Sequence, residues 1–269
     1  MKEKKEKTKT IKIFYSGNAL NERLNRLKNE KCTFTISFTG YTAIIKIGRF
    51  NEYYVKESVK NSFEIAQKIK SAIINSKIYV DEVHSDKIKY FSLNKLKAQK
   101  IKKVYNVDIN AAYPTALLNL GFISKELFDE LQALPKMKKL KAIGMLATKK
   151  TVFEFENGQQ VKAYFKVNDE LRNVWFAICQ EVGEAIDECK QNIKSFLFFW
   201  FDGIYYSDES ETEKIIEILN KRKFASKKEV LSNFTVIHSE HNVMISYLKG
   251  DRKTPKNFCI PKAERAIYG

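Results

Sequence analysis

The stretch that decides the fold is Val104-Tyr105-Asn106-Val107-Asp108-Ile109-Asn110-Ala111-Ala112-Tyr113-Pro114-Thr115-Ala116-Leu117-Leu118. Its first residues predict a strand, and the residues from Tyr113 onward predict a helix that follows a turn. Asp108 stands where the strand ends. We therefore expect this carboxylate at the edge of a sheet, held by rigid backbone on one side and a helix on the other.

A second aspartate, Asp202, lies in the most apolar stretch of the chain, Phe196 to Tyr206. That stretch is aromatic and β-branched, which favours two buried strands with Asp202-Gly203 at the turn between them. Two carboxylates on adjacent strands can bridge Mg²⁺ ions about 3.5–4 Å apart, the arrangement that nucleotidyl transfer uses. The spacing of two acidic residues is weak evidence by itself, since acidic residues at strand ends are common.

The chain between the two aspartates supplies the other strong structural signals. Asn157-Gly158 lies between two alternating segments and predicts a hairpin. Asp169 to Gln191 carries an apolar residue at every third or fourth position and is the longest predicted helix. Strands and helices are thus mixed rather than alternating, and the expected fold class is α+β.

The charge of the chain indicates a polyanionic partner. Its 269 residues include 48 Lys+Arg against 32 Asp+Glu, a formal net charge of +16. Such an excess favours nucleic acid as the partner. The alternative is that an AT-rich genome has inflated the lysine content, which the abundance of Asn and Ile also fits.

Membrane and secreted classes are disfavoured. No apolar run reaches the roughly 18 residues that a membrane helix needs. The charged residues Met1 to Lys7 have no apolar region behind them, so they do not form a secretory signal. The four cysteines have no zinc-binding spacing and indicate a reducing compartment; they are Cys32, Cys179, Cys189 and Cys259. We expect a cytoplasmic protein without a membrane partner, in the host cytoplasm if a phage encodes it.

Two motifs resemble those of family B DNA polymerases. Residues 108–114 resemble the first palm motif, an aspartate followed by variable residues and Tyr-Pro. Residues 200–205, Trp-Phe-Asp-Gly-Ile-Tyr, are similar to the later palm motif, normally Asp-Thr-Asp-Ser in a hairpin. Trp200 stands in place of the first aspartate and Gly203 in place of the serine. The resemblance covers roughly residues 100–262 and implies a palm, an antiparallel sheet backed by helices.

The resemblance also implies roles for individual residues. Asp108 and Asp202 would ligate Mg²⁺ or Mn²⁺. Tyr113 would pack under the incoming sugar and exclude a 2′-hydroxyl; the alternative is a core tyrosine that covers the start of the helix. Backbone amides just after Asp108 would contact the triphosphate, and these belong to Ile109, Asn110, Ala111 and Ala112.

The family's fingers motif, a lysine followed by Asn-Ser and Tyr-Gly, has no counterpart. The segment Pro135–Lys150 offers several lysines in its place, of which Lys141 is the expected triphosphate ligand. No Asp-x-Glu exonuclease pattern occurs in the first hundred residues. Basic residues near the C-terminus would grip the primer–template, or would form a solvated loop; they are Lys249, Arg252, Lys253, Lys256 and Lys262.

These observations predict a charged tail at residues 1–10, a β-rich α+β region at 11–100, and a palm-like catalytic region at 101–269 with reduced fingers at about 122–168. The expected function is that of a minimal, phage- or mobile-element-type DNA polymerase in replication. Its partners would be DNA (primer–template or single strand), nucleoside triphosphates and replication proteins. Two alternatives remain: a primase that makes short primers, and an inactive polymerase-like module that binds nucleic acid.

Overall fold

The computed structural model describes residues 9–80, 88, 90–93, 96–250 and 252–262. The first eight residues of the expected charged tail lie outside this described part. Contacts divide the chain into two units. Unit 1 comprises Met1–Lys77 and Asp129–Trp175, and unit 2 comprises Ile78–Phe128 and Phe176–Gly269. Most of the lysine-rich segment expected at 122–168 thus belongs to unit 1, together with the N-terminal strands.

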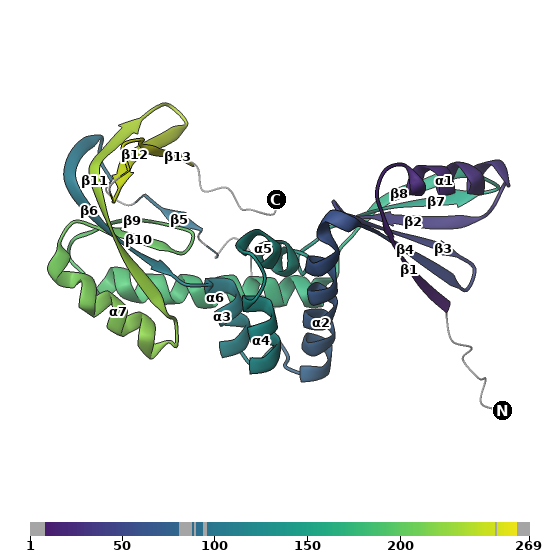
Figure 1. Cartoon of the computed structure of the whole chain (residues 1–269), viewed down its shortest axis with the longest axis horizontal. Coiled ribbons are helices and arrows are strands. Elements are labelled where there is room, and N and C mark those ends of the chain that lie inside the picture. The colour runs from purple at the N-terminus through teal and green to yellow at the C-terminus, as the bar shows by residue number, and fades with distance from the viewer. Residues whose placement is uncertain (1–8, 81–87, 89, 94–95, 251, 263–269) are drawn as a thin grey trace. The chain divides into compact units, whose positions relative to one another are not determined.

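Unit 1 is built on a six-stranded sheet in the order β1-β4-β3-β2-β7-β8 (Figure 1). β1 runs parallel to β4, and the other neighbouring pairs are antiparallel. The strands are β1 (Lys9–Tyr15), β2 (Phe34–Phe38), β3 (Thr42–Ile47), β4 (Phe50–Lys56), β7 (Lys150–Glu156) and β8 (Gln159–Lys166).

Alternating apolar residues give this sheet a buried face. Phe34 and Ile36 of β2 are buried together with Leu27 of α1 (Ala19–Asn29) in one hydrophobic cluster. The Phe34 ring stacks on the Phe155 ring with centroids 4.5 Å apart, which ties β2 to β7. After η1 (Glu57–Val59), α2 (Lys60–Ser76) buries its apolar stripe and packs against α5 (Lys136–Gly144).

The hairpin predicted at Asn157-Gly158 is confirmed, and its glycine is required by both backbone and packing. Gly158 has φ of 76°, and a Cβ built on it would lie 2.3 Å from the backbone oxygen of Lys28 in α1. The turn therefore fits against the end of α1 only with glycine at this position.

Unit 2 is built on a seven-stranded antiparallel sheet in the order β13-β12-β11-β6-β10-β9-β5 (Figure 1). Its strands are β5 (Phe91–Ser92), β6 (Gln99–Ile109), β9 (Phe196–Trp200), β10 (Gly203–Tyr206), β11 (Ser226–His238), β12 (Asn242–Lys249) and β13 (Lys256–Pro261). The chain also forms the helices α3 (Ala112–Asn119), α4 (Lys125–Gln132), α6 (Asp169–Asn192), η3 (Glu209–Glu211) and α7 (Thr212–Lys221). The division between the units falls within α4 and within α6.

Helices cover one face of the unit 2 sheet. α7 contacts β6 and β11, and the α6 residues from Phe176 onward lie on the same side as α7 (Figure 1). Arg222, which follows α7, joins the two helices because its Nε lies 2.7 Å from Glu188 Oε2 of α6. Val107 and Ile109 of β6 are almost fully buried.

The opposite face curls around a cluster of aromatic rings. Phe258 of β13 lies 6.1 Å from Trp200 of β9 and 6.3 Å from Tyr205 of β10, measured between ring centroids. Four strands separate β13 from β9 in the sheet order. The sheet must therefore be strongly curved, with these aromatic side chains on its inner face.

The fold class expected from the sequence, α+β with an antiparallel sheet backed by helices and a β-rich N-terminal region, is confirmed. Over the described residues, no helix combines the length and the apolar character needed to span a membrane.

Candidate functional site

The two aspartates singled out by the sequence lie at the same end of two paired strands of unit 2. Asp108 is the penultimate residue of β6, and Gly203 of β10 lies directly opposite it in the antiparallel register. Asp202 immediately precedes Gly203, and its carbonyl oxygen accepts a hydrogen bond of 2.9 Å from the backbone N–H of Ile109. The structure thus brings Asp108 and Asp202 to the same end of two hydrogen-bonded strands.

The turn that carries Asp202 differs from the one predicted. Trp200 pairs with Gly203, so the two turn residues are Phe201 and Asp202 rather than Asp202 and Gly203. Phe201 adopts the left-handed conformation, with φ of 53°, which non-glycine residues seldom do. The sequence pattern favours Gly203 as a turn residue. In the structure Gly203 is instead the first residue of β10, paired with Trp200 and Asp108.

Gly203 leaves room for the side chains around Asp108. A Cβ at this position would lie 3.1 Å from Nδ2 of Asn106 and 3.2 Å from Cε2 of Tyr205. Asn106 is buried, and its Nδ2 donates a hydrogen bond of 3.2 Å to the Ile204 carbonyl. A serine at position 203, as in the polymerase motif, would crowd this packing.

A chain of ion pairs extends from Asp108 across the neighbouring strands. Lys227 lies opposite Asp108 in the β6–β11 register, with its Nζ 3.4 Å from Asp108 Oδ2 and 3.3 Å from Glu229 Oε1. Glu229 in turn pairs with Lys249 of β12, Nζ to Oε1, at 2.5 Å. Two carboxylates and two ammonium groups therefore alternate beside the aromatic face of the sheet.

Each inner member of this chain is held in its charged form by its neighbours. Burial alone would lower the pKa of Lys227, but the charges of Asp108 and Glu229 outweigh it and raise that pKa. Burial alone would raise the pKa of Glu229, but the ion pairs with Lys249 and Lys227 outweigh it and lower that pKa. Both groups are consequently charged at neutral pH.

The charges of both aspartates contribute to the pKa of Tyr205. Its ring is buried and stacks on Phe198, with centroids 4.2 Å apart. Burial raises the pKa of the Tyr205 phenol far above its ordinary value, and the charges of Tyr247, Asp108 and Asp202 raise it further. The phenol therefore stays protonated at neutral pH.

Two of the backbone amides assigned to the triphosphate already donate hydrogen bonds within unit 2. The Ile109 N–H is bonded to Asp202, and the Asn110 N–H donates to the Ala225 carbonyl at 2.8 Å. These two amides are engaged within the sheet and its connection, which removes them from the expected triphosphate contacts. The amides of Ala111, Ala112 and Tyr113 lie at the N-terminus of α3, where Ala111 is in the left-handed conformation with φ of 49°.

The basic residues expected to grip nucleic acid lie in the β12–β13 hairpin. Four of them gather at one end: Lys249, Arg252, Lys253 and Lys256. Lys262 is at the other end, where its N–H donates to the His241 carbonyl at 2.8 Å. Lys141 belongs to unit 1, where its Nζ lies 5.0 Å from the centroid of the Tyr41 ring.

Sequence reasoning missed Lys227 and Glu229, because the first half of β11 was not predicted as a strand. The signal was present, since Lys227 and Glu229 are two residues apart and so share one face of an extended segment. Lys249 was assigned to DNA contacts, whereas the structure pairs it with Glu229.

The donor set fits a magnesium ion that is shared with a substrate. Across the described ranges, no group of three or more His, Cys, Asp or Glu side chains gathers closely enough for an all-protein metal cage. Mg²⁺ typically uses only one or two carboxylates together with substrate phosphates, and Asp108 and Asp202 supply two. No protein-family model matches the chain, and no curated protein matches it either.

Proposed function

We propose that unit 2 catalyses nucleic-acid-templated nucleotidyl transfer, which extends a DNA strand with nucleoside triphosphates and Mg²⁺ or Mn²⁺. One observation carries the proposal: the hydrogen bond from the Ile109 N–H to the Asp202 carbonyl fixes the backbone of Asp202, in the turn between β9 and β10, at the end of β6 that carries Asp108. Carboxylates held by rigid strands are what a two-metal site needs. The basic hairpin and the net charge of +16 support a polyanionic substrate.

In this reaction a 3′-oxygen attacks the α-phosphorus of the triphosphate, and pyrophosphate leaves. Asp108 and Asp202 would hold the Mg²⁺. When bound, Mg²⁺ neutralises the phosphate oxygens and lowers the pKa of the attacking hydroxyl. Lys227, fixed between Asp108 and Glu229, adds a cation that phosphate oxygens can contact. Tyr113, at the start of α3, is the residue that would lie against the sugar.

Arg252, Lys253 and Lys256 of the β12–β13 hairpin would contact phosphates of the primer–template. Such contacts fix the position of the duplex without reading its sequence.

A second candidate function is nucleic-acid binding without catalysis. The observation that favours it is the ion pair between Lys227 and Asp108, because an ammonium 3.4 Å from the carboxylate competes with a metal ion for the same oxygens. A primase differs from the leading proposal only in starting strands without a primer.

A primer-extension assay tests the proposal. The wild-type protein, Asp108→Asn and Asp202→Asn are incubated with primed template, all four deoxynucleotides and Mg²⁺ or Mn²⁺. Asp187→Asn is the matched control because Asp187 is an exposed carboxylate on α6. We expect incorporation by the wild type and by the control, and a loss of at least a hundredfold in the two site variants, within the range that removal of an electrostatic catalytic group causes.

The same assay separates the alternatives. Incorporation on an unprimed single strand would assign primase activity. Binding of labelled DNA by all four proteins, with no incorporation by any of them, would contradict the proposal and favour the non-catalytic module.

A further inference from the structure

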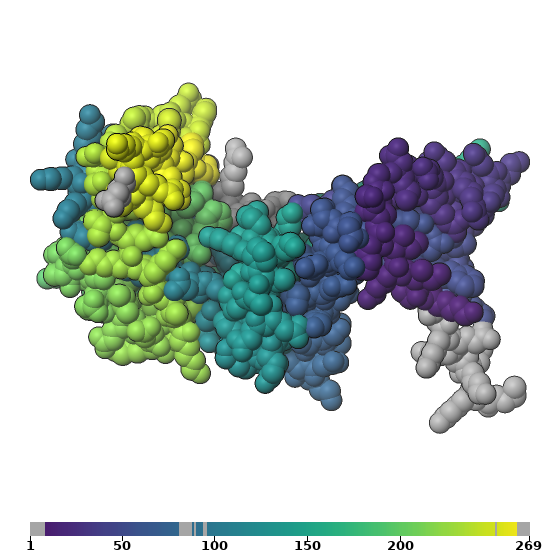
Figure 2. All heavy atoms as spheres, viewed as in Figure 1, coloured from purple at the N-terminus to yellow at the C-terminus, as the bar shows by residue number. Residues whose placement is uncertain are grey.

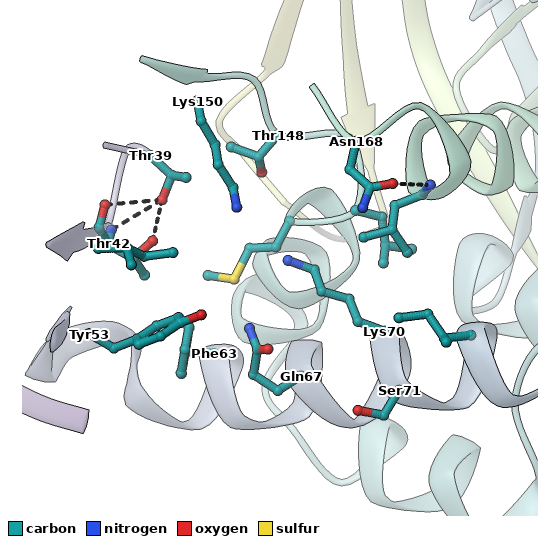
Figure 3. Close-up of a pocket in the computed structure, with 15 residues that line it drawn as sticks. Thr39, Thr42, Tyr53, Phe63, Gln67, Lys70, Ser71, Thr148, Lys150 and Asn168 are labelled. Carbon is teal, nitrogen blue, oxygen red and sulfur yellow. Dashed lines mark hydrogen bonds between the residues drawn. The ribbon is translucent and has the colours of Figure 1, made fainter. Parts of the chain in front are cut away.

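Unit 1 contains a cavity of about 270 Å³ that the proposed reaction does not use. Its walls come from β3, β4, α2, the segment that follows α5, β7 and the start of α6 (Figure 3). All fifteen lining residues belong to unit 1. At this size, the cavity matches a small ligand or the polar end of a larger one.

Two lysines project into the cavity. Figure 3 shows the ammonium groups of Lys70, from α2, and Lys150, from β7, both directed into it. Both side chains are half-buried. Among the residues that the structure describes, neither ammonium group has a carboxylate partner or a hydrogen bond, and only other lysines act on them. Burial of an unpaired charge is costly, so a bound anion would stabilise these two lysines.

The remaining lining residues suit an anion. None of the fifteen is Asp or Glu, and seven of them bring hydroxyl or amide groups. These seven are Thr39, Thr42, Tyr53, Gln67, Ser71, Thr148 and Asn168. Asn168 also caps α6, since its Oδ1 accepts a hydrogen bond of 3.0 Å from the Leu171 N–H. The positive end of a 24-residue helix therefore adds to the charge of the lysines.

The electrostatics of the two lysines agree with this geometry. Burial, and then the charge of Lys150, lower the pKa of Lys70 to about 8. Burial, and then the charges of Lys166 and Lys46, lower the pKa of Lys150. A bound anion would relieve the repulsion that contributes to both shifts.

We propose that this cavity binds a phosphate group, with Lys70 and Lys150 as its principal cationic contacts. A phosphate monoester carries close to two negative charges at neutral pH and offers several acceptor oxygens. It thereby matches two ammonium groups and a surrounding set of hydroxyl and amide donors better than a carboxylate does. The source of the phosphate is a free nucleotide, a small phosphate compound or the 5′-phosphate end of a nucleic acid.

Isothermal titration calorimetry on the full chain tests the inference. The ligands are inorganic phosphate, pyrophosphate, ATP, and matched short oligonucleotides with a 5′-phosphate or a 5′-hydroxyl. The variants are Lys70→Gln and Lys150→Gln, and the control is Lys68→Gln. Lys68 lies on the same helix two residues from Lys70, but its ammonium pairs with Glu130 and it does not line the cavity.

We expect at least one phosphate ligand to bind the wild type, with an affinity at least tenfold lower in Lys70→Gln and in Lys150→Gln. The Lys68→Gln protein should stay within twofold of the wild type. Preference for the 5′-phosphate oligonucleotide would identify a nucleic-acid end as the source, and preference for ATP or pyrophosphate would identify a nucleotide. Equal weakening in all three variants would show that only the general positive charge attracts the anions, and it would overturn the inference. Absence of binding by the wild-type protein would overturn it as well.

Because the test uses ligands without a template or a primer and reads binding alone, it is independent of catalysis. Loss of polymerase activity in Asp108→Asn leaves the cavity unaffected. Failure of phosphate to bind the cavity leaves the proposed reaction in unit 2 untouched.

Discussion

Replacement of Lys227 by methionine should increase the affinity of the aspartate pair for a divalent ion. The Lys227 ammonium lies 3.4 Å from Asp108 Oδ2, where it competes with any cation for that oxygen. Two unit charges at this separation interact by about 1 kcal/mol in water. A divalent ion at twice the distance is repelled by the same ammonium with about the same energy, since its charge is doubled. Methionine keeps most of the length of the side chain and removes the charge.

We therefore expect Lys227→Met to bind Mn²⁺ about fivefold more tightly at low salt, which corresponds to about 1 kcal/mol. Mn²⁺ binding is measured by electron paramagnetic resonance, with the signal of the free ion as the readout. Lys228→Met is the matched control: the residue is the next one on β11 and loses the same charge, but its ammonium pairs with Glu209 at 2.5 Å. An unchanged or weaker Mn²⁺ affinity in Lys227→Met, compared with Lys228→Met, would refute the placement of the ion at Asp108.

Two further predictions concern the stability of unit 1. Gly158→Ala should lower the free energy of unfolding by about 3 kcal/mol, because the left-handed backbone adds to the collision with Lys28. The control is Gly48→Ala, because Gly48 is also left-handed but has open space around it. This change should lower the free energy of unfolding by about 1 kcal/mol. Equal losses of the two variants in urea denaturation would contradict the packing argument. The pKa of Lys70 is lowered from 10.5 to about 8, so the unfolded chain binds more protons between these values and stability should rise as the pH rises from 8 to 10.5. The gain in the free energy of unfolding should be about 2 kcal/mol after allowance for partial exposure, and it should be absent in Lys70→Met. If urea denaturation gives the two proteins the same dependence of stability on pH, Lys70 is not desolvated.

Local patterns predicted the elements whose signal lies within one segment. The hairpin at Asn157-Gly158 and the long helix, predicted at Asp169 to Gln191 and found at Asp169–Asn192, are both confirmed. In each case a single periodicity or a turn dipeptide is sufficient, because the stabilising contacts lie on one face of one element.

The two longest strands of unit 2 were predicted poorly. The run of lysines in Ser92 to Lys103 predicts a basic helix or connector, yet β6 begins at Gln99. The sequence predicts a strand only at Phe234–Ile237, in the region where β11 runs from Ser226 to His238. The lysine-rich half of β6 pairs with β11. Neither segment has the apolar alternation of a strand there. Each is held as a strand by backbone hydrogen bonds to the other, which lies more than a hundred residues away in the sequence and leaves no local signal.

The candidate site was predictable only in part, for the same reason. Asp108 and Asp202 could be identified because each stands within a recognisable strand pattern. Lys227 and Glu229 reach Asp108 through the register of β11 against β6, and no local pattern contains that register. The cavity of unit 1 is assembled from five separate stretches of chain and has no sequence signature.

The most direct test of the central claim is the Mn²⁺ occupancy of the aspartate pair in the presence of a nucleoside triphosphate. Electron paramagnetic resonance titrations compare the wild type with Asp108→Asn, Asp202→Asn and the control Asp187→Asn. If Asp108 and Asp202 form one metal site, each site variant should lose Mn²⁺ binding by at least tenfold, and Asp187→Asn should match the wild type. Retention of wild-type Mn²⁺ affinity by either site variant would contradict the account.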